Sequence, residues 1–321
     1  MRKRQLYIAL LAVAAIVCLL FFGRSKGQRD ASFQYNEGTI FGTLYHAKYL
    51  YDKDLQAELE AELQKVDASL SMFNPKSTIS RINRNETDEV DEMLREVLVL
   101  SFTIYKATDG AFDPTVAPLV NAWGFGFKNG QMPDSTQVDS LLTLVGLSHI
   151  HLDGNKLKKD NPLSILDFSA IAKGYGVDRA AQVLRGKGIK NFMIEIGGEV
   201  VTAGVNDKGE PWRIGINKPD DDSTSTNTEL QDVITISGKA IATSGNYRNY
   251  YIKDGRKIAH TINPKTGYPA QQDILSSTVI APTCAEADAF ATAFMVLGTE
   301  GAKQVLEKQP QLETYFITND K

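Results

Sequence analysis

The chain has 321 residues, of which 42% are hydrophobic and 9% aromatic, with 25 glycines, 11 prolines and two cysteines. This ordinary globular balance excludes an intrinsically disordered chain, a collagen-like chain and a disulfide scaffold. Residues 1–29 hold six basic residues and no acidic one, which leaves 29 basic against 39 acidic residues in the body of the chain. Nucleic-acid binding is disfavoured, because it needs a basic face that this acidic body does not offer.

The N-terminus carries a membrane-targeting pattern. The basic stretch MRKR precedes an uninterrupted 17-residue apolar run from Leu6 to Phe22. Bilayer-spanning helices need about 17–25 apolar residues and signal-peptide cores about 7–15, so a retained anchor is slightly favoured over a cleaved signal. We expect residues 1–29 to target the inner cell membrane and residues 30–321 to form a domain on its periplasmic side. Cys18 leaves a lipoprotein alternative open, although the large residues before it disfavour that processing.

Two amphipathic helices are predicted in the first half of the body. From Tyr51 to Leu70 and from Val90 to Ala107, apolar residues recur every three or four positions with charged residues between them. Asp109-Gly110 provides a stop for the second helix. The next segment, GAFDPTVAPLVNAWGFG at 110–126, is too rich in Gly and Pro for one regular element. Its apolar content predicts a packed loop that lines a site.

The second half predicts mainly short strands, which points to an α+β architecture. The strand-like runs are SILDF (164–168), NFMIEI (191–196), EVVTAGV (199–205), WRIGIN (212–217), VITIS (233–237) and AIATS (240–244). One helix is expected at 173–185, another at 285–297 and a short one at 301–310. The polar segment 219–232 is interpreted as a solvated hairpin loop, because its acidic residues are consecutive rather than spaced as in a calcium loop.

Polar residues gather first in DFSAIAKGYGVD (167–178) and in EIGGEV (195–200). A helix that begins near Lys173 would direct free backbone N–H groups toward an anion, or Ser169 would simply cap that helix and leave Lys173 in solvent. Gly197 and Gly198 indicate either a β-bulge, the commoner case, or close approach of a ligand to the backbone. A dinucleotide-binding fingerprint of three glycines is not present.

A third and a fourth cluster follow at 242–269 and 282–294. His260 comes at the end of a short strand and beside the rigid turn NPKTG, where its side chain can be held in a fixed direction. Asp288 and Thr292 lie four residues apart on one face of a helix and offer two hard oxygens to Mg²⁺. The alternative is a solvated Asp288 with Thr292 bonded to its own backbone. Cys284 is interpreted as a packing residue, because no base is paired with it.

The motifs, in this order and combination, resemble the ApbE family, the FAD:protein FMN transferases. They are D-x-x-A-x-x-K-G-Y-x-x-D at 167–178, G-G-E at 197–199, T-S-G-N-Y at 243–247, H-x-I-N-P-x-T-G-Y-P at 260–269 and A-D-A-x-A-T at 287–292. The likeness continues upstream through FGT at 41–43, SMFNPKSTISRIN at 71–83 and residues 109–126, so it covers the body from about residue 36. Asn263 departs from the pattern, since many members have Asp there.

The resemblance implies an ApbE-like fold with mixed or antiparallel sheets, flanking helices and an active site in a cleft between subdomains. It also implies an enzyme that cleaves FAD, moves FMN onto a threonine hydroxyl of an exported redox subunit with a short Gly/Ser/Thr motif, and releases AMP. Mg²⁺ would lie between Ala170, which offers only its carbonyl, Asp288 and Thr292. The FAD-binding residues would be Phe41 (often Met in the family), Phe73, Ala111, Phe112, Asp113, Asp167, Lys173, Gly197, Gly198, Thr243, Ser244 and Ile262.

The chemistry of the residues agrees with this assignment. A divalent ion, with Lys173 as an added cation, can offset the charge that develops in phosphoryl transfer. The attacking hydroxyl must lose a proton, and His260 is the histidine embedded in a motif, whereas His46, His149 and His151 are not. We therefore expect His260 to be the general base. Two alternatives stay open: a Mg²⁺-dependent FAD pyrophosphatase that releases free FMN and AMP, and a non-catalytic, membrane-tethered flavin-binding or flavin-delivery protein.

Overall fold

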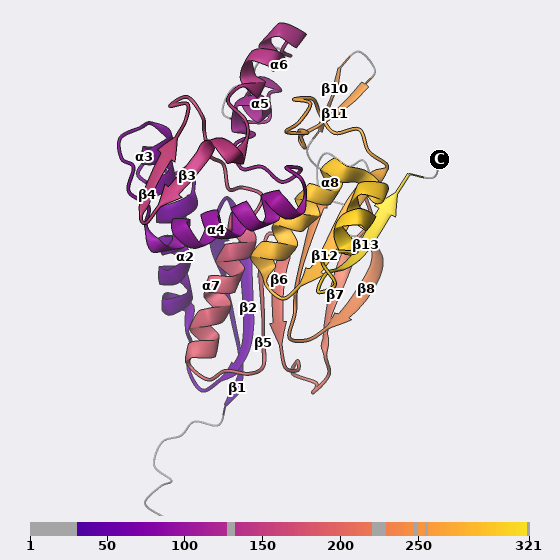
Figure 1. Ribbon diagram of the computed structural model, residues 1–321. Helices are drawn as coiled ribbons and strands as arrows, with labels where there is room; N and C mark the ends of the chain where they lie inside the picture. The colour runs from indigo at the N-terminus through magenta and orange to yellow at the C-terminus, as the bar shows by residue number, and fades with distance from the viewer. Residues whose placement is uncertain (1–30, 127–131, 220–228, 247–249, 254–255, 320–321) are drawn as a thin grey trace, which may run out of the picture.

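A computed structural model of the chain describes residues 31–126, 132–219, 229–246, 250–253 and 256–319 (Figure 1). The targeting segment 1–29 and most of the polar segment 219–232 lie outside these ranges. Within the described ranges, we find no helix with the length and apolar character needed to cross a membrane.

A seven-stranded sheet forms the centre of the molecule, and its spatial order follows the order of the chain (Figure 1). Every pair of neighbouring strands is antiparallel. The strands, from one edge to the other, are β1 (Ser32–Ile40), β2 (Thr43–Tyr51), β5 (Phe192–Ile196), β6 (Glu199–Ala203), β9 (Ala240–Gly245), β12 (Ile274–Ala281) and β13 (Glu313–Thr318).

Successive residues of the central strands point to opposite faces, so the sheet has two packed faces. Val201 and Ala240 belong to the core beneath the helices, whereas Val200, Ile241 and Ile280 form a second core with a β-hairpin on the other face. The helices are α2 (Gln56–Leu70), α4 (Glu92–Ala107), α7 (Ala172–Gly186) and α8 (Cys284–Leu306), and the hairpin strands are β7 (Trp212–Asn217) and β8 (Leu230–Ile236). This layering confirms the predicted α+β class.

A smaller layer lies above the sheet in Figure 1 and has its own apolar core. It contains α5 (Ala117–Ala122), α6 (Ser135–Leu142), β10 (Tyr250–Lys253) and β11 (Arg256–Ala259). Its core is formed by Leu119, Trp123, Val138, Ile258 and Ile262. The Trp123 indole N–H donates to the Gly267 carbonyl at 2.8 Å, which ties the end of α5 to the turn after β11. The remaining short elements are α3 (Thr78–Asn83), a 3₁₀ turn (Leu147–His149), β3 (Ile150–Asp153) and β4 (Lys156–Lys159).

Several element predictions need correction. The helix expected from Tyr51 begins at Gln56, because residues up to Tyr51 belong to β2. The segment 110–126, predicted to be a loop, contains the short helix α5. SILDF is not a strand, since the Asn83 side-chain amide donates to the Leu166 carbonyl and accepts from the Leu166 N–H, where a neighbouring strand would bond. The two last helices are present as one element, α8, with a kink at Gly298.

Candidate active site

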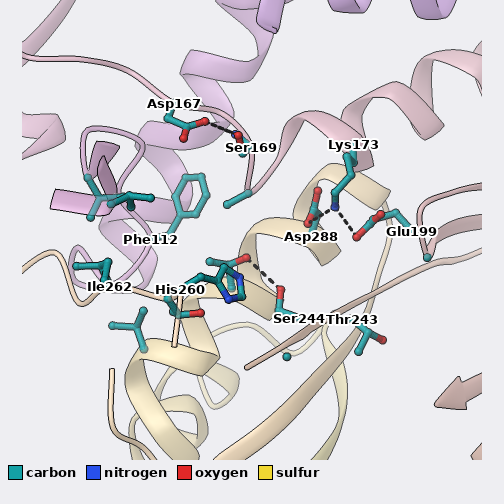
Figure 2. Close-up of a pocket in the computed structure, with 18 of the residues that line it drawn as sticks. Phe112, Asp167, Ser169, Lys173, Glu199, Thr243, Ser244, His260, Ile262 and Asp288 are labelled. Atoms are coloured by element: carbon teal, nitrogen blue, oxygen red, sulfur yellow. Dashed lines mark hydrogen bonds and ion pairs between the residues drawn. The ribbon is translucent and has the colours of Figure 1, made fainter. Parts of the chain in front are cut away.

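A cavity of about 450 Å³ lies between the small upper layer and the ends of the central strands (Figure 2). A volume of this size is typical of small-molecule sites, which have roughly 300–1,000 Å³. It collects side chains from segments far apart in the chain. Of the residues expected from sequence to bind FAD or metal or to act in catalysis, the following line it: Ala111, Phe112, Asp113, Asp167, Ala170, Lys173, Gly197, Gly198, Thr243, Ser244, His260, Ile262, Asp288 and Thr292.

The two remaining predicted residues, Phe41 and Phe73, line an adjoining cavity of about 720 Å³. This second cavity has a mostly apolar wall, and the Phe73 side chain is 77% exposed at its rim. The two cavities share Asp167, Lys173 and His260 in their linings. The structure therefore joins a chamber bordered by several charged side chains to a more apolar one, with a carboxyl group, an ammonium group and an imidazole in both linings.

Lys173 lies beside two acidic side chains that line the first cavity, as Figure 2 shows. Its Nζ lies 2.6 Å from Glu199 Oε1 and 3.8 Å from Asp288 Oδ1. Burial alone would lower the pKa of Lys173, but the Asp288 and Glu199 carboxylates outweigh it and hold that pKa above its usual value. Burial raises the pKa of Glu199, although Lys173 opposes the rise. The alternative of a Lys173 ammonium free in solvent is wrong, because that ammonium is paired with Glu199.

Helices α7 and α8 approach each other closely enough to place Asp288 beside Lys173. A Cβ atom at Gly174 would lie 2.3 Å from the Cys284 carbonyl oxygen, so only glycine fits there. The Gly174 N–H donates to Asp288 Oδ2 at 3.1 Å, which directs the carboxylate toward the positive end of α7. Asp178 accepts the Cys284 and Ala285 N–H groups, both at 2.9 Å, and so anchors the first turn of α8.

Asp288 and Thr292 share one face of α8, as their spacing predicts. Asp288 is 3% exposed, so a solvated carboxylate is ruled out. The Thr292 hydroxyl lies 3.1 Å from that of Ser244, and the Thr243 hydroxyl lies 2.8 Å from that of Thr278. Cys284 is buried, and burial raises the pKa of its thiol well above the usual value, which agrees with a packing role.

The oxygen atoms of this region fit Mg²⁺. Mg²⁺ binds few protein oxygens and completes its shell with water and phosphate, and Asp288, Thr292 and the Ala170 carbonyl belong to the donor types it accepts. In the described part of the chain, no group of three or more His, Cys, Asp or Glu residues could hold a metal. Glu199 Oε2 is buried and has no hydrogen-bond partner among the described residues. Two buried carboxylates, Glu199 and Asp288, therefore face the single ammonium of Lys173, and a divalent cation on Asp288 would balance the remaining negative charge.

Gly197 and Gly198 form a two-residue turn between β5 and β6, not the β-bulge that the sequence favoured. Both have positive φ, 61° and 105°, as a tight hairpin turn requires. The Gly197 N–H donates to the Leu44 carbonyl at 3.1 Å, and the Gly198 N–H donates to Glu195 Oε1 at 2.6 Å. Since both amides have partners, the turn contributes shape to the cavity rather than two free donors for phosphate.

Asp113 and Asp167 hold the loops that line the cavity. Asp113 accepts the Thr115 N–H and hydroxyl and the Leu147 N–H. Asp167 accepts the Ser169 N–H at 2.8 Å and its hydroxyl at 2.5 Å, so Ser169 does not cap α7. Burial raises the pKa of both carboxyl groups, and these hydrogen bonds oppose the rise.

His260 directly follows β11, and its ring meets Phe125 edge-on at 6.3 Å between centroids. The turn after it is rigid, because the Gly267 N–H donates to the Asn263 carbonyl at 2.8 Å. His149 and His151 share Asp160 on the surface, and His46 pairs with Glu195. Among these four histidines, His260 alone lines the two cavities.

Sequence reasoning missed two residues of this region. Glu199 was quoted within G-G-E and Asp178 within the 167–178 motif, and neither was assigned a place in the site. The available signal for Glu199 was an acidic residue at the start of an otherwise apolar strand, where burial without a charged partner is costly. The signal for Asp178 was a carboxylate on the apolar face of an amphipathic helix.

Comparison with known proteins gives a consistent result. The model of the ApbE family matches residues 41–316. The chain is 37% identical to the FAD:protein FMN transferase of Haemophilus influenzae, over 98% of this chain and 93% of that protein, and 37% identical to that of Vibrio cholerae, over 92% and 90%. Among solved structures, the flavin transferase ApbE from Vibrio cholerae superimposes with a TM-score of 0.82 at 36% identity, covering 91% of this chain and 95% of the other. The apo flavinyl transferase ApbE of Pseudomonas stutzeri gives 0.81 at 31%, covering 91% and 92%.

Proposed function

This chain belongs to the ApbE family and is a flavin transferase, and we propose that it moves FMN from FAD to a threonine hydroxyl of an acceptor protein. In this reaction the threonine oxygen forms a bond to the phosphorus of the FMN phosphoryl group. The bond from that phosphorus to the bridging oxygen breaks, AMP leaves with this oxygen, and the threonine proton passes to a base. Atoms and charge balance without any other reactant.

The observation that carries the proposal is the meeting of His260, Lys173 and Asp167 where a cavity bordered by charged side chains joins a more apolar one. FAD has a polar diphosphate between two ring systems, and a paired site of this kind suits it. Phe41 and Phe73 in the apolar cavity offer contacts to an aromatic ring. The reacting phosphorus would then lie near the junction, within the region that these charged and polar side chains border.

Each residue has a distinct role in the proposed reaction. His260 accepts the threonine proton, for which an imidazole has a suitable pKa. Lys173 places a positive charge beside the phosphate oxygens. Ala170, Asp288 and Thr292 would hold Mg²⁺, which supplies neutralisation of the diphosphate charge when bound. Asp167 and Asp113 keep the cavity-lining loops in place through the hydrogen bonds described above.

The cellular setting of the proposal rests on the N-terminal sequence. MRKR followed by the apolar run Leu6–Phe22 favours an anchor in the inner membrane with the catalytic body on the periplasmic side. The acceptor would then be an exported redox subunit with a short Gly/Ser/Thr motif. We expect added protease to digest residues 30–321 in spheroplasts but not in intact cells. Protection in spheroplasts would contradict the periplasmic placement.

The full-length chain in detergent should be incubated with FAD, Mg²⁺ and an exported acceptor, alongside the same acceptor with its motif threonine changed to Ala. We expect the intact acceptor to gain the mass of FMN less water, with an equal amount of AMP, and EDTA to abolish both products. AMP without acceptor modification would favour the pyrophosphatase. Tight FAD binding without AMP would favour a flavin-binding protein.

A further inference from the structure

Glu199 is an unusual residue for the position that it occupies. It is the first residue of β6, directly after the Gly197-Gly198 turn, and it is 3% exposed. Its Oε1 contacts Lys173 Nζ at 2.6 Å, and its Oε2 has no hydrogen-bond partner among the described residues. A buried carboxylate with one unsatisfied oxygen destabilises a fold relative to an apolar side chain of similar size. Packing alone therefore does not account for Glu199.

The geometry around Lys173 suggests what Glu199 does. The Lys173 ammonium lies in direct contact with Glu199 but 3.8 Å from Asp288 Oδ1, which is beyond hydrogen-bond distance. The other oxygen of Asp288 accepts the Gly174 N–H. Asp288 is thus fixed by α7 through one oxygen, while its second oxygen is near the ammonium without being bonded to it.

Lys173 has two acidic neighbours among its described ion pairs, Glu199 and Asp288. If Glu199 lost its charge, Asp288 would be the acidic neighbour that is left. A flexible lysine chain would then move onto Asp288 Oδ1, because an ion pair at hydrogen-bond distance is stronger than one at 3.8 Å in a site of low polarity. A divalent cation that needs this same oxygen would have to displace the ammonium.

We propose that Glu199 is a positioning residue that holds the Lys173 ammonium away from Asp288, so that the Asp288 carboxylate stays open to a divalent cation. The inference rests on the proposed function, because it takes Asp288 as a cation ligand. It adds that Glu199 acts through Lys173 and not as a ligand itself. The glutamate of the G-G-E motif would thus keep the Lys173 ammonium from competing with the divalent cation for the Asp288 carboxylate.

The test is a double-mutant cycle with Mn²⁺ as the probe. Binding to the full-length protein in detergent is followed by the loss of the aqueous Mn²⁺ EPR signal, for wild type, Glu199→Gln, Lys173→Met and the double variant. We expect Glu199→Gln to weaken Mn²⁺ binding about tenfold while Lys173 is present, and less than about threefold in the Lys173→Met background. Lys173→Met alone should strengthen binding, since it removes the competing cation.

The outcomes separate this inference from the proposed function. Equal fold-losses in both backgrounds would show that Glu199 acts directly on the cation, and unchanged binding in Glu199→Gln would show no role; either result overturns the inference alone. A wild-type protein that does not bind Mn²⁺ would overturn this inference and the proposed metal site, whereas FMN transfer itself is tested separately by acceptor mass and AMP release. Glu195→Gln is the matched control, because Glu195 bonds the Gly198 N–H at the same turn without contacting Lys173. It should leave Mn²⁺ affinity unchanged and verify that any effect is specific to Glu199.

Discussion

Individual carboxyl groups in this protein have different roles because their hydrogen-bond and ion-pair partners differ. Asp288 and Asp178 are both largely shielded from solvent and both bond the backbone of a neighbouring helix. Asp178 has two backbone donors and no ion pair among the described residues, whereas Asp288 lies beside an ammonium. The first arrangement builds the contact between α7 and α8, and the second is suited to chemistry.

Changing His260 to Gln tests the proposed base. The amide is similar in size and polarity but does not accept a proton near neutral pH, so we expect kcat for FMN transfer to fall by about 10²–10⁴-fold. FAD affinity, measured by fluorescence titration, should stay within about twofold of wild type. A variant that transfers FMN at the full rate would show that another group takes the proton.

Asp178 gives the protein a stability that depends on pH. Burial raises its pKa from 3.8 to about 6, against the backbone hydrogen bonds that lower it. The folded state therefore retains a proton that the unfolded state releases, so this contribution is complete below pH 3.8 and is lost as the pH rises through about 6. Between pH 5 and pH 7.5 the loss is about 1 kcal/mol. Urea unfolding at pH 5 and at pH 7.5 should show this loss of stability in wild type and not in Asp178→Asn. The same pH dependence in both proteins would contradict the assignment to Asp178.

At the scale of elements, the spacing of apolar residues predicted the helices and strands in which buried residues recur at regular intervals. The bodies of α2, α4 and α7 and the strands β5 to β9 are present where apolar spacing placed them. The long strands β1 and β2 escaped prediction because their sequences mix polar and apolar residues, and β1 is an edge strand that buries few of them. SILDF failed for another reason, since its backbone bonds to a side chain distant in sequence, which local patterns do not record.

The kink in α8 has a steric requirement at one residue. Gly298 has φ 69° and ψ 179°, a conformation available essentially only to glycine, and a Cβ there would lie 2.8 Å from Gln272 Oε1. We expect Gly298→Ala to lower the free energy of unfolding by about 1–3 kcal/mol in urea denaturation. Gly186→Ala, at the open end of α7, is the matched control and should be neutral or slightly stabilising. Equal effects of the two changes would contradict the steric account.

At the scale of the whole molecule, the site lies where two separately packed bodies meet. His260 and Ile262 follow β11 in the small upper layer, while Lys173 and Asp288 belong to helices that cover the sheet. The resemblance to the family predicted which residues line the cavities, because the matched motifs contain those residues. It left out the Lys173–Glu199 contact, which depends on how α7 and β6 pack against each other.

The two bodies predict separable effects of core mutations. Trp123→Leu perturbs the small core and its bond to Gly267, so FAD affinity should fall about tenfold with little loss of global stability. Leu63→Ala removes a buried side chain from the core between the helices and the sheet and should cost about 2–5 kcal/mol of unfolding free energy with FAD affinity retained. FAD titration and urea denaturation of both variants check this. If each variant lost both FAD affinity and unfolding free energy, the two layers would not act as separate bodies.

The agreement between strand order and chain order has a consequence for biosynthesis. Each strand of the sheet after β1 pairs with the one of these seven that comes before it in the chain. A polypeptide that emerges N-terminus first therefore meets an already synthesised neighbour at every step after β1 and never inserts a strand between two that are already paired. We expect amide protection in stalled nascent chains to advance from β1 toward β13, and early protection of β12 before β5 would contradict this order. The sheet is built so that it can be assembled in the direction in which a ribosome or an export channel delivers it.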